Sequence, residues 1–329
     1  MTVQLSLTES GAIASGGGSD LPELKVVLAA PRGFCAGVRR AIDAVSDALA
    51  AHGAPVYVRR AIVHNLEVVR ELEQQGAIFV QELDEIPAGA VVLFSAHGVD
   101  PRLAEDALAR GLIVYDAVCP LVSKVHREVQ RHARDGRTVV LIGHVDHPEI
   151  IGTLGHVGPG MAFVVNSPRE VAELPIANDS PVGVGIQTTY AVDDAAEIIE
   201  ALRKRFSDLA EPASSDICYA TSNRQAAVRA LAAVVDAVIV AGEDFSSNAT
   251  RLAEVASSEC ASVQLIANAA AIAWDKLPQR GSIGITAAAS TPEPVVQSIV
   301  AELGSRYSVS VSELETMRET TVFKRLAIA

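Results

Sequence analysis

The sequence predicts an α/β protein made of three pseudo-repeated α/β units with mostly parallel sheets. Short apolar runs alternate with amphipathic stretches along most of the 329 residues, and polar side chains follow directly after many of these runs. The composition agrees, because 49% of the residues are hydrophobic but only 4% are aromatic, which suits buried parallel strands of aliphatic residues. In addition, Cys35, Cys119 and Cys218 each lie past or near an apolar run and just before an expected helix start.

The expected elements alternate between strand and helix in chain order. In the first unit we expect strands at 25–30, 55–58, 62–63, 78–80, 90–95 and 112–115, and helices at 38–50, from 66 and at 101–110. In the second we expect strands at 138–142, 162–165 and 182–186, and helices at 121–134 and 193–206. In the third we expect helices at 225–233 and from 250, and strands at 237–241, 263–266 and 282–286. The predicted boundaries are a flexible N-terminal tail at 1–24, units at 25–118, 119–214 and 215–303, and a C-terminal segment at 304–329.

Charge and hydropathy argue against several classes of function. The formal net charge is −13, and both nucleic-acid binding and anionic-membrane binding need a basic face. No run approaches the roughly 18 consecutive apolar residues of a membrane-spanning helix. The N-terminal residues lack the basic and apolar regions of a signal peptide. We therefore expect a cytoplasmic protein, in which the four cysteines are metal ligands or free thiols more often than disulfides.

The cysteines in the three units indicate a metal centre. A strand end followed by a helix start offers free backbone N–H groups and the positive end of a helix dipole. This setting stabilises a thiolate, the form that binds metal. Spacing alone also allows an ordinary explanation, since free cysteine is among the most buried residue types. The flanking residues decide between the two.

Polar residues follow the predicted strands in all three units. They are His64, His97, His147, Thr188, Ser246, Ser247, Asn248 and Ser290. A parallel sheet places residues after its strands along one edge, where ligands bind. A set of His, Ser, Thr and Asn side chains can donate hydrogen bonds to a phosphate or diphosphate. Any one of the histidines taken alone is more simply explained as an imidazole with a structural partner.

Glu149 is a candidate proton donor, because it follows His147 and Pro148 at a predicted strand end. A glutamate in a partly dry site has a raised pKa and can donate a proton near neutral pH. The alternative is a turn with a solvated carboxylate. Standard motifs are missing from the sequence: it has no phosphate-binding P-loop, no HExxH motif and no paired CxxC.

The motifs together resemble those of a known family. They are PRGFCAGVRRAI, IVHNLEVV, SAHGV, DAVCPLVSKVH, GHVDHPEIIGTLG, QTTYAVDD, DICYATSNRQAAV, SSNATRL and GITAAASTPEPVVQ. In this order, over roughly residues 25–305, the sequence is similar to the LytB/IspH family of 4-hydroxy-3-methylbut-2-enyl diphosphate reductases. The N-terminal tail lies outside the resemblance.

The resemblance implies a fold and a chemistry. It implies three α/β units around one central [4Fe–4S] cluster per chain, held by Cys35, Cys119 and Cys218, with one iron open to the substrate hydroxyl. The implied reaction is the two-electron reductive dehydroxylation of an allylic diphosphate to isopentenyl and dimethylallyl diphosphate, the last step of the methylerythritol phosphate route. The implied electron donor is a protein such as ferredoxin or flavodoxin.

The resemblance also assigns roles to single residues. Glu149 matches the proton-delivering glutamate, and Thr188 and His147 match its catalytic neighbours. The residues that match the diphosphate-binding set are His64, His97, His147, Thr188, Ser246, Ser247, Asn248 and Ser290. Cys260 matches no ligand motif.

Some positions depart from the family pattern. Arg39 stands where the family more often has an acidic or apolar residue, and residues 243–245 are Glu-Asp-Phe instead of a Ser-Lys-Asn type of sequence. The motif after them reads Ser-Asn-Ala-Thr-Arg, and GITAGAS becomes GITAAAS. An acidic pair beside a diphosphate pocket can weaken anion binding. It keeps a second hypothesis open, a non-catalytic redox-sensing or ligand-sensing paralogue. A zinc hydrolase is a third.

Overall fold

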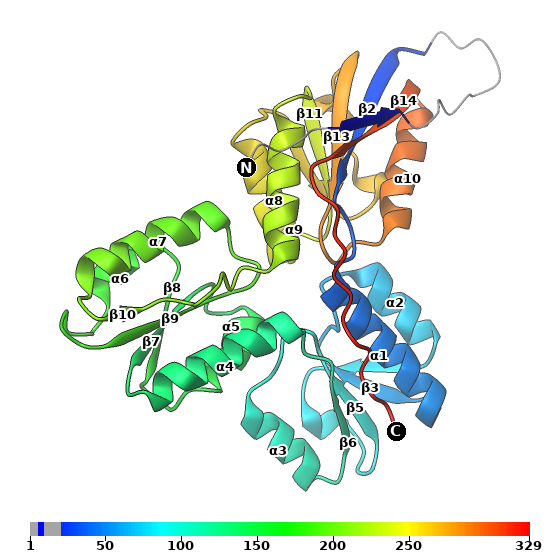
Figure 1. Cartoon of the computed structure of the whole chain (residues 1–329). Coiled ribbons are helices and arrows are strands. Elements are labelled where there is room, and N and C mark those ends of the chain that lie inside the picture. The colour runs from blue at the N-terminus through cyan, green and yellow to red at the C-terminus, as the bar shows by residue number, and fades with distance from the viewer. Residues whose placement is uncertain (1–5, 10–20) are drawn as a thin grey trace. The chain divides into compact units, whose positions relative to one another are not determined.

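The computed structural model describes residues 6–9 and 21–329, and these residues form two compact units (Figure 1). We call the first the six-strand unit. It contains the described residues up to Cys35, then His64–Leu66 and Tyr219–Val322. We call the second the two-sheet unit, which comprises Ala36–Val63, Glu67–Cys218 and Phe323–Ala329.

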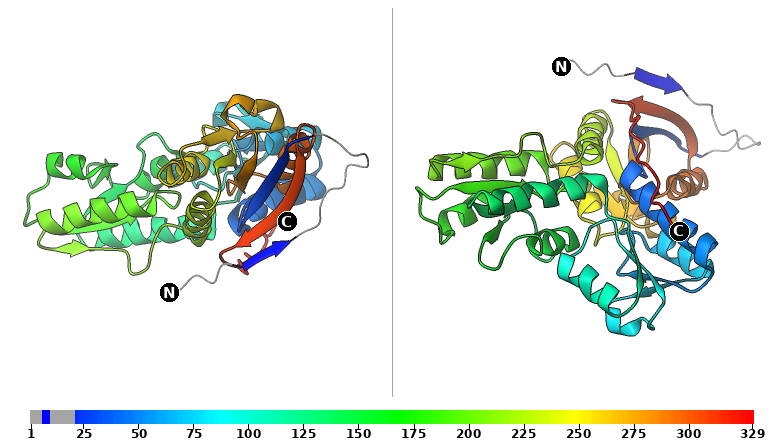
Figure 2. Two further views of the ribbon diagram at one scale, coloured as in Figure 1. Left: turned by 90° about the horizontal axis from the view of Figure 1, so that it is seen from above. Right: turned by 60° about the horizontal axis from the view of Figure 1, so that its bottom comes forward.

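One six-stranded sheet forms the six-strand unit. Its strands, in spatial order, are β1 (Ser6–Glu9), β14 (Ser308–Glu315), β2 (Glu23–Ala30), β13 (Gly281–Ala287), β11 (Ala237–Ala241) and β12 (Val263–Ile266). All neighbours are parallel except β1 and β14. Strands β2 and β14, far apart in the sequence, run side by side (Figure 2).

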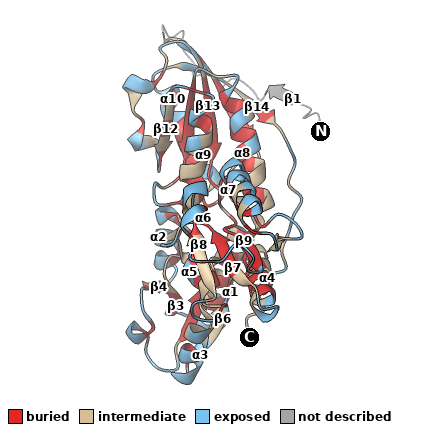
Figure 3. Ribbon diagram, turned by 90° about the vertical axis from the view of Figure 1, so that its left-hand side faces the viewer, coloured by how far each residue is buried: buried red, intermediate tan, exposed pale blue. Residues whose placement is uncertain are grey.

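Helices cover both faces of this sheet. They are α8 (Tyr219–Ala232), α9 (Ser247–Ser257) and α10 (Glu293–Gly304), with short 3₁₀ helices at Ala269–Ala271 and Trp274–Lys276. Alternate strand residues point to opposite faces. Val26, Ile239 and Ile285 therefore pack under α10, whereas Val238 and Val240 pack under α8 and α9. Burial on both faces explains why β2 and β11 contain continuous apolar runs (Figure 3).

Two four-stranded parallel sheets form the two-sheet unit. One has the order β4 (Ala77–Val80), β3 (Val56–Arg59), β5 (Val91–Phe94) and β6 (Ile113–Asp116). The other has the order β10 (Leu209–Ala210), β9 (Val182–Ile186), β7 (Thr138–Ile142) and β8 (Ala162–Val165). All their pairings are parallel, so the polar residues after the strands collect at the carboxyl ends.

The helices of the two-sheet unit pack on these sheets. Those beside the first sheet are α1 (Ala36–His52), α2 (Leu66–Gln74), α3 (Pro101–Ala109) and the 3₁₀ helix Leu83–Glu85. Those beside the second are α4 (Pro120–Arg134), α5 (Pro148–Leu154), α6 (Pro168–Glu173) and α7 (Val192–Arg205). Val129 of α4 contacts the core on one face of the second sheet, and Ile198 of α7 contacts the core on the other.

The predicted α/β class with three mostly parallel sheets is confirmed. The pairing differs from the expected segment boundaries in two places. Strand β2, expected in the first unit, pairs with β13 and β14, and the C-terminal segment supplies β14. Ser6–Glu9 and the start of β2 are strands within the expected tail of residues 1–24. Most of that tail lies outside the described residues.

Helix starts also differ from those expected. Helix α8 begins at Tyr219 instead of 225, and α9 begins at Ser247 instead of 250. The first turns of the two helices, YATSN and SNAT, are mostly polar, so the apolar periodicity that predicts a helix begins only after them. The start of α9 is fixed by Ser246, whose side chain caps the helix by accepting the amide of Ala249. None of the helices in residues 21–329 is long and apolar enough to span a membrane.

Candidate active site

The three cysteines singled out from the sequence occupy the same local position. Cys35, Cys119 and Cys218 each directly precede the first residue of a helix, namely α1, α4 and α8. None of the three forms a disulfide within the described residues, and all three are of intermediate exposure. The fourth cysteine, Cys260, is buried among aliphatic side chains in the core of the six-strand unit.

A backbone hydrogen bond holds each of the three against the end of a strand. The amide of each donates to a carbonyl two residues beyond the end of β13, β5 or β9. The pairs are Cys35 with Ala289 (3.2 Å), Cys119 with Ala96 (2.9 Å) and Cys218 with Thr188 (3.0 Å). The three thiols are thus presented by turns of one design.

The two compact units divide these cysteines between them. Cys35 belongs to the six-strand unit, and Cys119 and Cys218 belong to the two-sheet unit. Among residues 6–9 and 21–329, no group of three or more His, Cys, Asp or Glu side chains has the geometry of a metal site. The set of three ligands therefore stays a prediction.

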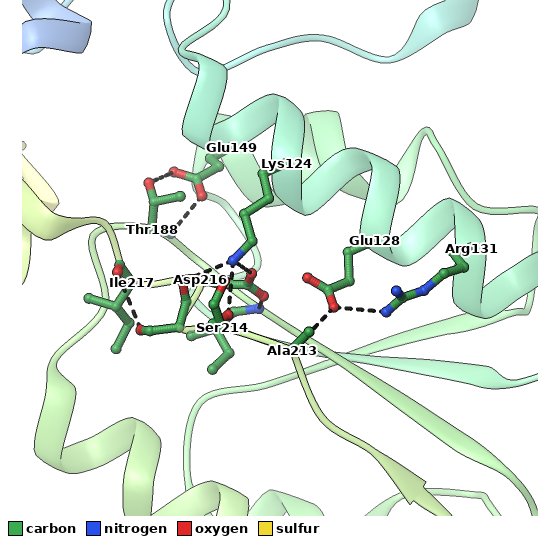
Figure 4. Close-up of polar contacts among 11 residues, drawn as sticks. Lys124, Glu128, Arg131, Glu149, Thr188, Ala213, Ser214, Asp216 and Ile217 are labelled. Atoms are coloured by element: carbon green, nitrogen blue, oxygen red, sulfur yellow. Dashed lines mark hydrogen bonds and ion pairs between the residues drawn. The ribbon is translucent and has the colours of Figure 1, made fainter. Parts of the chain in front are cut away.

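Glu149 and Thr188 form a buried polar pair in the two-sheet unit (Figure 4). The Thr188 amide donates to Glu149 Oε1 at 2.7 Å, and the Thr188 hydroxyl donates to Oε2 at 2.8 Å. The carbonyl of the same threonine accepts the amide of Cys218. Thr188 therefore links the Glu149 carboxyl group to the turn that carries Cys218.

Burial raises the pKa of Glu149 to about 7. The charge of Asp216 acts in the same direction, whereas both hydrogen bonds from Thr188 stabilise the carboxylate and act against it. A carboxyl group with this pKa exists in both protonation states near neutral pH, as a general acid must.

Two of the predicted histidines lie together in the same unit. The rings of His97 and His147 meet edge to face, with centroids 5.8 Å apart. His147 caps α5 by accepting the amide of Glu149 on its Nδ1 at 3.2 Å, and Ser95 contacts the Nδ1 of His97 at 3.1 Å. The structure thus brings His97 and His147 close to Glu149.

The other predicted anion-binding residues gather in the six-strand unit. The Ser290 hydroxyl donates to the His64 carbonyl at 3.0 Å, and Asn248 Oδ1 accepts the amide of Ala289 at 2.8 Å. Ser246 and Ser247 form the start of α9. Burial lowers the pKa of His64 to about 4, so this imidazole is neutral at pH 7.

Asn248 keeps a hydrogen-bond donor available. Its Nδ2 is buried and makes no hydrogen bond within the described part of the chain. A buried donor left unpaired costs free energy, so the site suits a ligand that supplies an acceptor oxygen.

The acidic substitution at 243–245 has a structural role. Glu243 Oε1 accepts the amide of Leu66, the first residue of α2, at 3.1 Å. Phe245 meets His64 edge to face at 6.1 Å between centroids, and half of its surface is exposed. The Glu243 carboxylate therefore has a partner of its own.

Two functional neighbours were missed from the sequence. Asp216 has a fully buried carboxylate that pairs with Lys124 (3.1 Å) and accepts the amide of Ile186 (3.1 Å). Burial raises the pKa of Asp216 to about 6, against the opposing effect of Lys124. Lys124 lies in the motif DAVCPLVSKVH and Asp216 in the motif DICYATSNRQAAV. The sequence feature that could have revealed Asp216 is its place two residues before a cysteine.

Fold and site together define a three-sheet α/β protein with thiols at helix starts and a buried acid. The family model described as LytB protein matches residues 26–304, so the chain belongs to the LytB family. The 4-hydroxy-3-methylbut-2-enyl diphosphate reductase of Beijerinckia indica is 47% identical over 307 residues, covering 93% of this chain and 96% of that protein.

Two further relatives agree with this assignment. The reductase of the same name from Bordetella pertussis is 50% identical over 303 residues, covering 92% of each chain. The solved E-1-hydroxy-2-methyl-but-2-enyl-4-diphosphate reductase of Plasmodium falciparum is 35% identical with a TM-score of 0.89, covering 93% of this chain and 96% of that one. The resemblance inferred from the motifs is confirmed.

Proposed function

We propose that this protein reduces 4-hydroxy-3-methylbut-2-enyl diphosphate to isopentenyl and dimethylallyl diphosphate, as the last step of the methylerythritol phosphate route. The names of relatives that match over almost the whole chain support the reaction. The observation that carries the proposal is the buried Glu149 carboxyl group, which Thr188 links to the Cys218 turn.

We propose one [4Fe–4S] cluster per chain, with Cys35, Cys119 and Cys218 as its ligands. The donor set fits: no disulfide engages these thiols within the described residues, all three are partly exposed, and each lies at a helix start where the thiolate is stabilised. Soft thiolates select iron–sulfur clusters over hard cations. When bound, the cluster supplies a path for two electrons and a Lewis-acidic iron.

The residues of the chain bind the substrate and move a proton. The reaction breaks the allylic C–O bond, consumes two electrons and two protons, and releases water. Glu149 is the proposed source of a proton, with Thr188 and His147 holding it in place. The diphosphate is bound by neutral polar side chains, with Asn248 Nδ2 as a donor that has no partner in the described part of the chain. The others are those of His64, His97, His147, Thr188, Ser246, Ser247 and Ser290.

An acidic protein can hold an anion in this way. Neutral hydrogen-bond donors create a local site that does not depend on the net charge of −13. A cytoplasmic location and a small electron-transfer protein such as ferredoxin or flavodoxin as the donor complete the proposal.

The test is an anaerobic purification followed by measurement of iron, sulfide and turnover with a strong artificial reductant. We expect a brown protein with about four irons that converts the allylic diphosphate. Cys119→Ser should lose iron and lose at least the roughly 10- to 100-fold in activity that follows removal of a ligand's partner. Cys260→Ser is the matched control and should keep both.

The outcomes separate the competing hypotheses. Turnover excludes a pure sensor. An iron-loaded protein without turnover supports the sensing paralogue. A colourless protein with stoichiometric zinc supports the hydrolase, and an active Cys119→Ser protein overturns the ligand assignment.

A further inference from the structure

The helices that follow the three cysteines share a second feature. Each carries a cation five or six residues after its cysteine: Arg40 on α1, Lys124 on α4 and Arg224 on α8. Each cation donates hydrogen bonds to backbone carbonyls elsewhere in the chain. In every case the acceptors include one or two carbonyls just before a different cysteine; Arg40 also donates to the Lys324 carbonyl, and Arg224 to the Ala220 carbonyl of its own helix.

Arg40 holds the turn before Cys119. Its Nη1 donates to the carbonyls of Ala117 at 3.2 Å and Val118 at 3.0 Å. These are the two residues that precede this cysteine in the chain. The contact lies within the two-sheet unit.

Lys124 holds the turn before Cys218 (Figure 4). Its ammonium group donates to the carbonyls of Ser214 (2.9 Å) and Ser215 (3.0 Å) and to Asp216 Oδ1 (3.1 Å). Asp216 in turn accepts the amide of Ile186 from β9, the strand that leads to Thr188. The segment is therefore tied to both α4 and β9.

Arg224 holds the turn before Cys35 within the six-strand unit. Its Nε and Nη2 both donate to the carbonyl of Gly33, at 3.1 and 2.7 Å. The side chain is 1% exposed, and Glu319 neutralises its charge at 2.9 Å. A buried guanidinium is costly unless its donors are satisfied, so this contact is a strong one.

The three contacts follow a cyclic order. The cation after Cys35 contacts the turn before Cys119, the cation after Cys119 contacts the turn before Cys218, and the cation after Cys218 contacts the turn before Cys35. Cations that served only to satisfy stray carbonyls would have no reason to follow this order.

We propose that Arg40, Lys124 and Arg224 are positioning residues, each of which sets the turn that presents the next cysteine in this cycle. The inference rests on the proposed function only in taking the cysteines as cluster ligands. Each cation thus connects the helix that follows one cysteine to the turn that positions another cysteine. Loosening one contact should displace a single thiol and leave the other two in place.

Amide hydrogen exchange of the metal-free protein tests this, because each cysteine amide has a defined acceptor. The variants are Arg40→Met, Lys124→Met and Arg224→Met. We expect the amide of Cys119, Cys218 and Cys35, respectively, to exchange roughly 10- to 100-fold faster, the factor for loss of a charge-assisted hydrogen bond. The other two cysteine amides should stay within about twofold of the wild type.

The matched control is Arg205→Met. Arg205 of α7 also donates to carbonyls of a distant turn, at Leu174 and Ile176 (2.7 Å each), but this turn carries no cysteine. None of the three cysteine amides should change in this variant. If one of the three Met variants does not fold, the corresponding variant Arg40→Lys, Lys124→Arg or Arg224→Lys should show a smaller change at the same amide.

Iron release supplies a second measurement. The holoprotein variants should lose iron to a chelator faster than wild type, whereas the KM for the diphosphate stays unchanged. The proposal would be overturned if a Met variant exchanged faster at all three cysteine amides or at none of them. It would also be overturned if the faster amide were that of the cysteine directly before the mutated helix. The exchange experiment needs neither cluster nor substrate, so its failure is distinct from a failure of the proposed function.

Discussion

Glu149 shows how two opposing effects set the protonation of one side chain. Its carboxyl group is 2% exposed, and this burial raises its pKa from 4.5 to about 7. Two hydrogen bonds from Thr188 favour the carboxylate and limit the rise. Below about pH 7 the group holds the proton that it is proposed to deliver, and above this pH the proton is lost.

The pH dependence of turnover tests this balance in Thr188→Val. The wild-type rate should fall on the alkaline side of about pH 7 as Glu149 ionises. The substitution removes the hydroxyl that stabilises the carboxylate, so the pKa of Glu149 should rise. A hydrogen bond to a charged group contributes roughly 1.5–3 kcal/mol, so we expect the alkaline limb of kcat to move up by about one pH unit or more.

Glu149→Gln is the companion variant for that profile. It should lower kcat strongly, leave KM nearly unchanged and abolish the alkaline limb. A limb that persists in this variant would assign the titration to another group. A limb that moves down in Thr188→Val would contradict the proposed direction of the Thr188 effect.

Motifs reveal reactive residues better than they reveal the residues that hold them. Cys35, Cys119 and Glu149 stand out because they follow predicted strands, at the edge of a parallel sheet where ligands bind. Lys124 and Arg224 do not, because a cation in a helix is usually solvated. Their contacts join positions about 90 or more residues apart, which local sequence patterns cannot show.

At the scale of elements, the two units repeat an arrangement of residues around strand ends that does not show as a repeat of the sequence. Five residues after the end of β7 and of β11 a side chain caps the next helix, His147 for α5 and Ser246 for α9. Glu149 and Asn248 lie two residues after these caps. Each accepts a backbone amide, that of Thr188 or Ala289, from the residue two positions beyond the end of another strand. The sequence shows only the repeated plan, because the equivalent side chains differ.

This equivalence predicts the behaviour of Asn248→Asp. Like Glu149, an aspartate still accepts the neighbouring amide, here that of Ala289, so the thermal unfolding temperature should fall less than in Asn248→Ala. The buried Nδ2 donor is replaced by a negatively charged oxygen that repels a diphosphate. We expect KM to rise roughly 10- to 100-fold with a smaller change in kcat, measured by steady-state kinetics.

Asn248→Ala separates the two roles of the side chain. It removes the acceptor as well as the donor, so it should lower the unfolding temperature in addition to raising KM. An unchanged KM in Asn248→Asp would show that the amide faces no substrate anion.

At the scale of the whole molecule, the chain passes repeatedly between the two units. The six-strand unit takes strands from both ends of the chain, and β2 lies between β13 and β14. Hydrophobic runs reveal β2, but they do not reveal its partners, because pairing depends on contacts almost 300 residues apart. Strand β14 lies beyond the expected end of the third unit at residue 303, although its sequence, SVSVSELE, begins with the polar–apolar alternation of a half-buried strand.

This topology leads to a prediction for a fragment of residues 215–329. The fragment contains β11–β14 and α8–α10 but lacks β2, so β14 has no neighbour that joins it to β13. Val26 and Leu28 would also be missing from the core under α10. We expect the fragment to be largely unfolded by circular dichroism and by amide exchange.

Supplying the missing strand should restore the sheet. A fusion that joins residues 21–35 to the fragment through a flexible linker supplies β2, the strand that pairs with both β13 and β14. It should gain cooperative thermal unfolding, whereas the same fusion with Val26 and Leu28 changed to Asp should not. A fragment that folds without β2 would mean that residues 215–303 are an independent unit, as the sequence alone suggested, and that β2 and β14 are additions to a complete core.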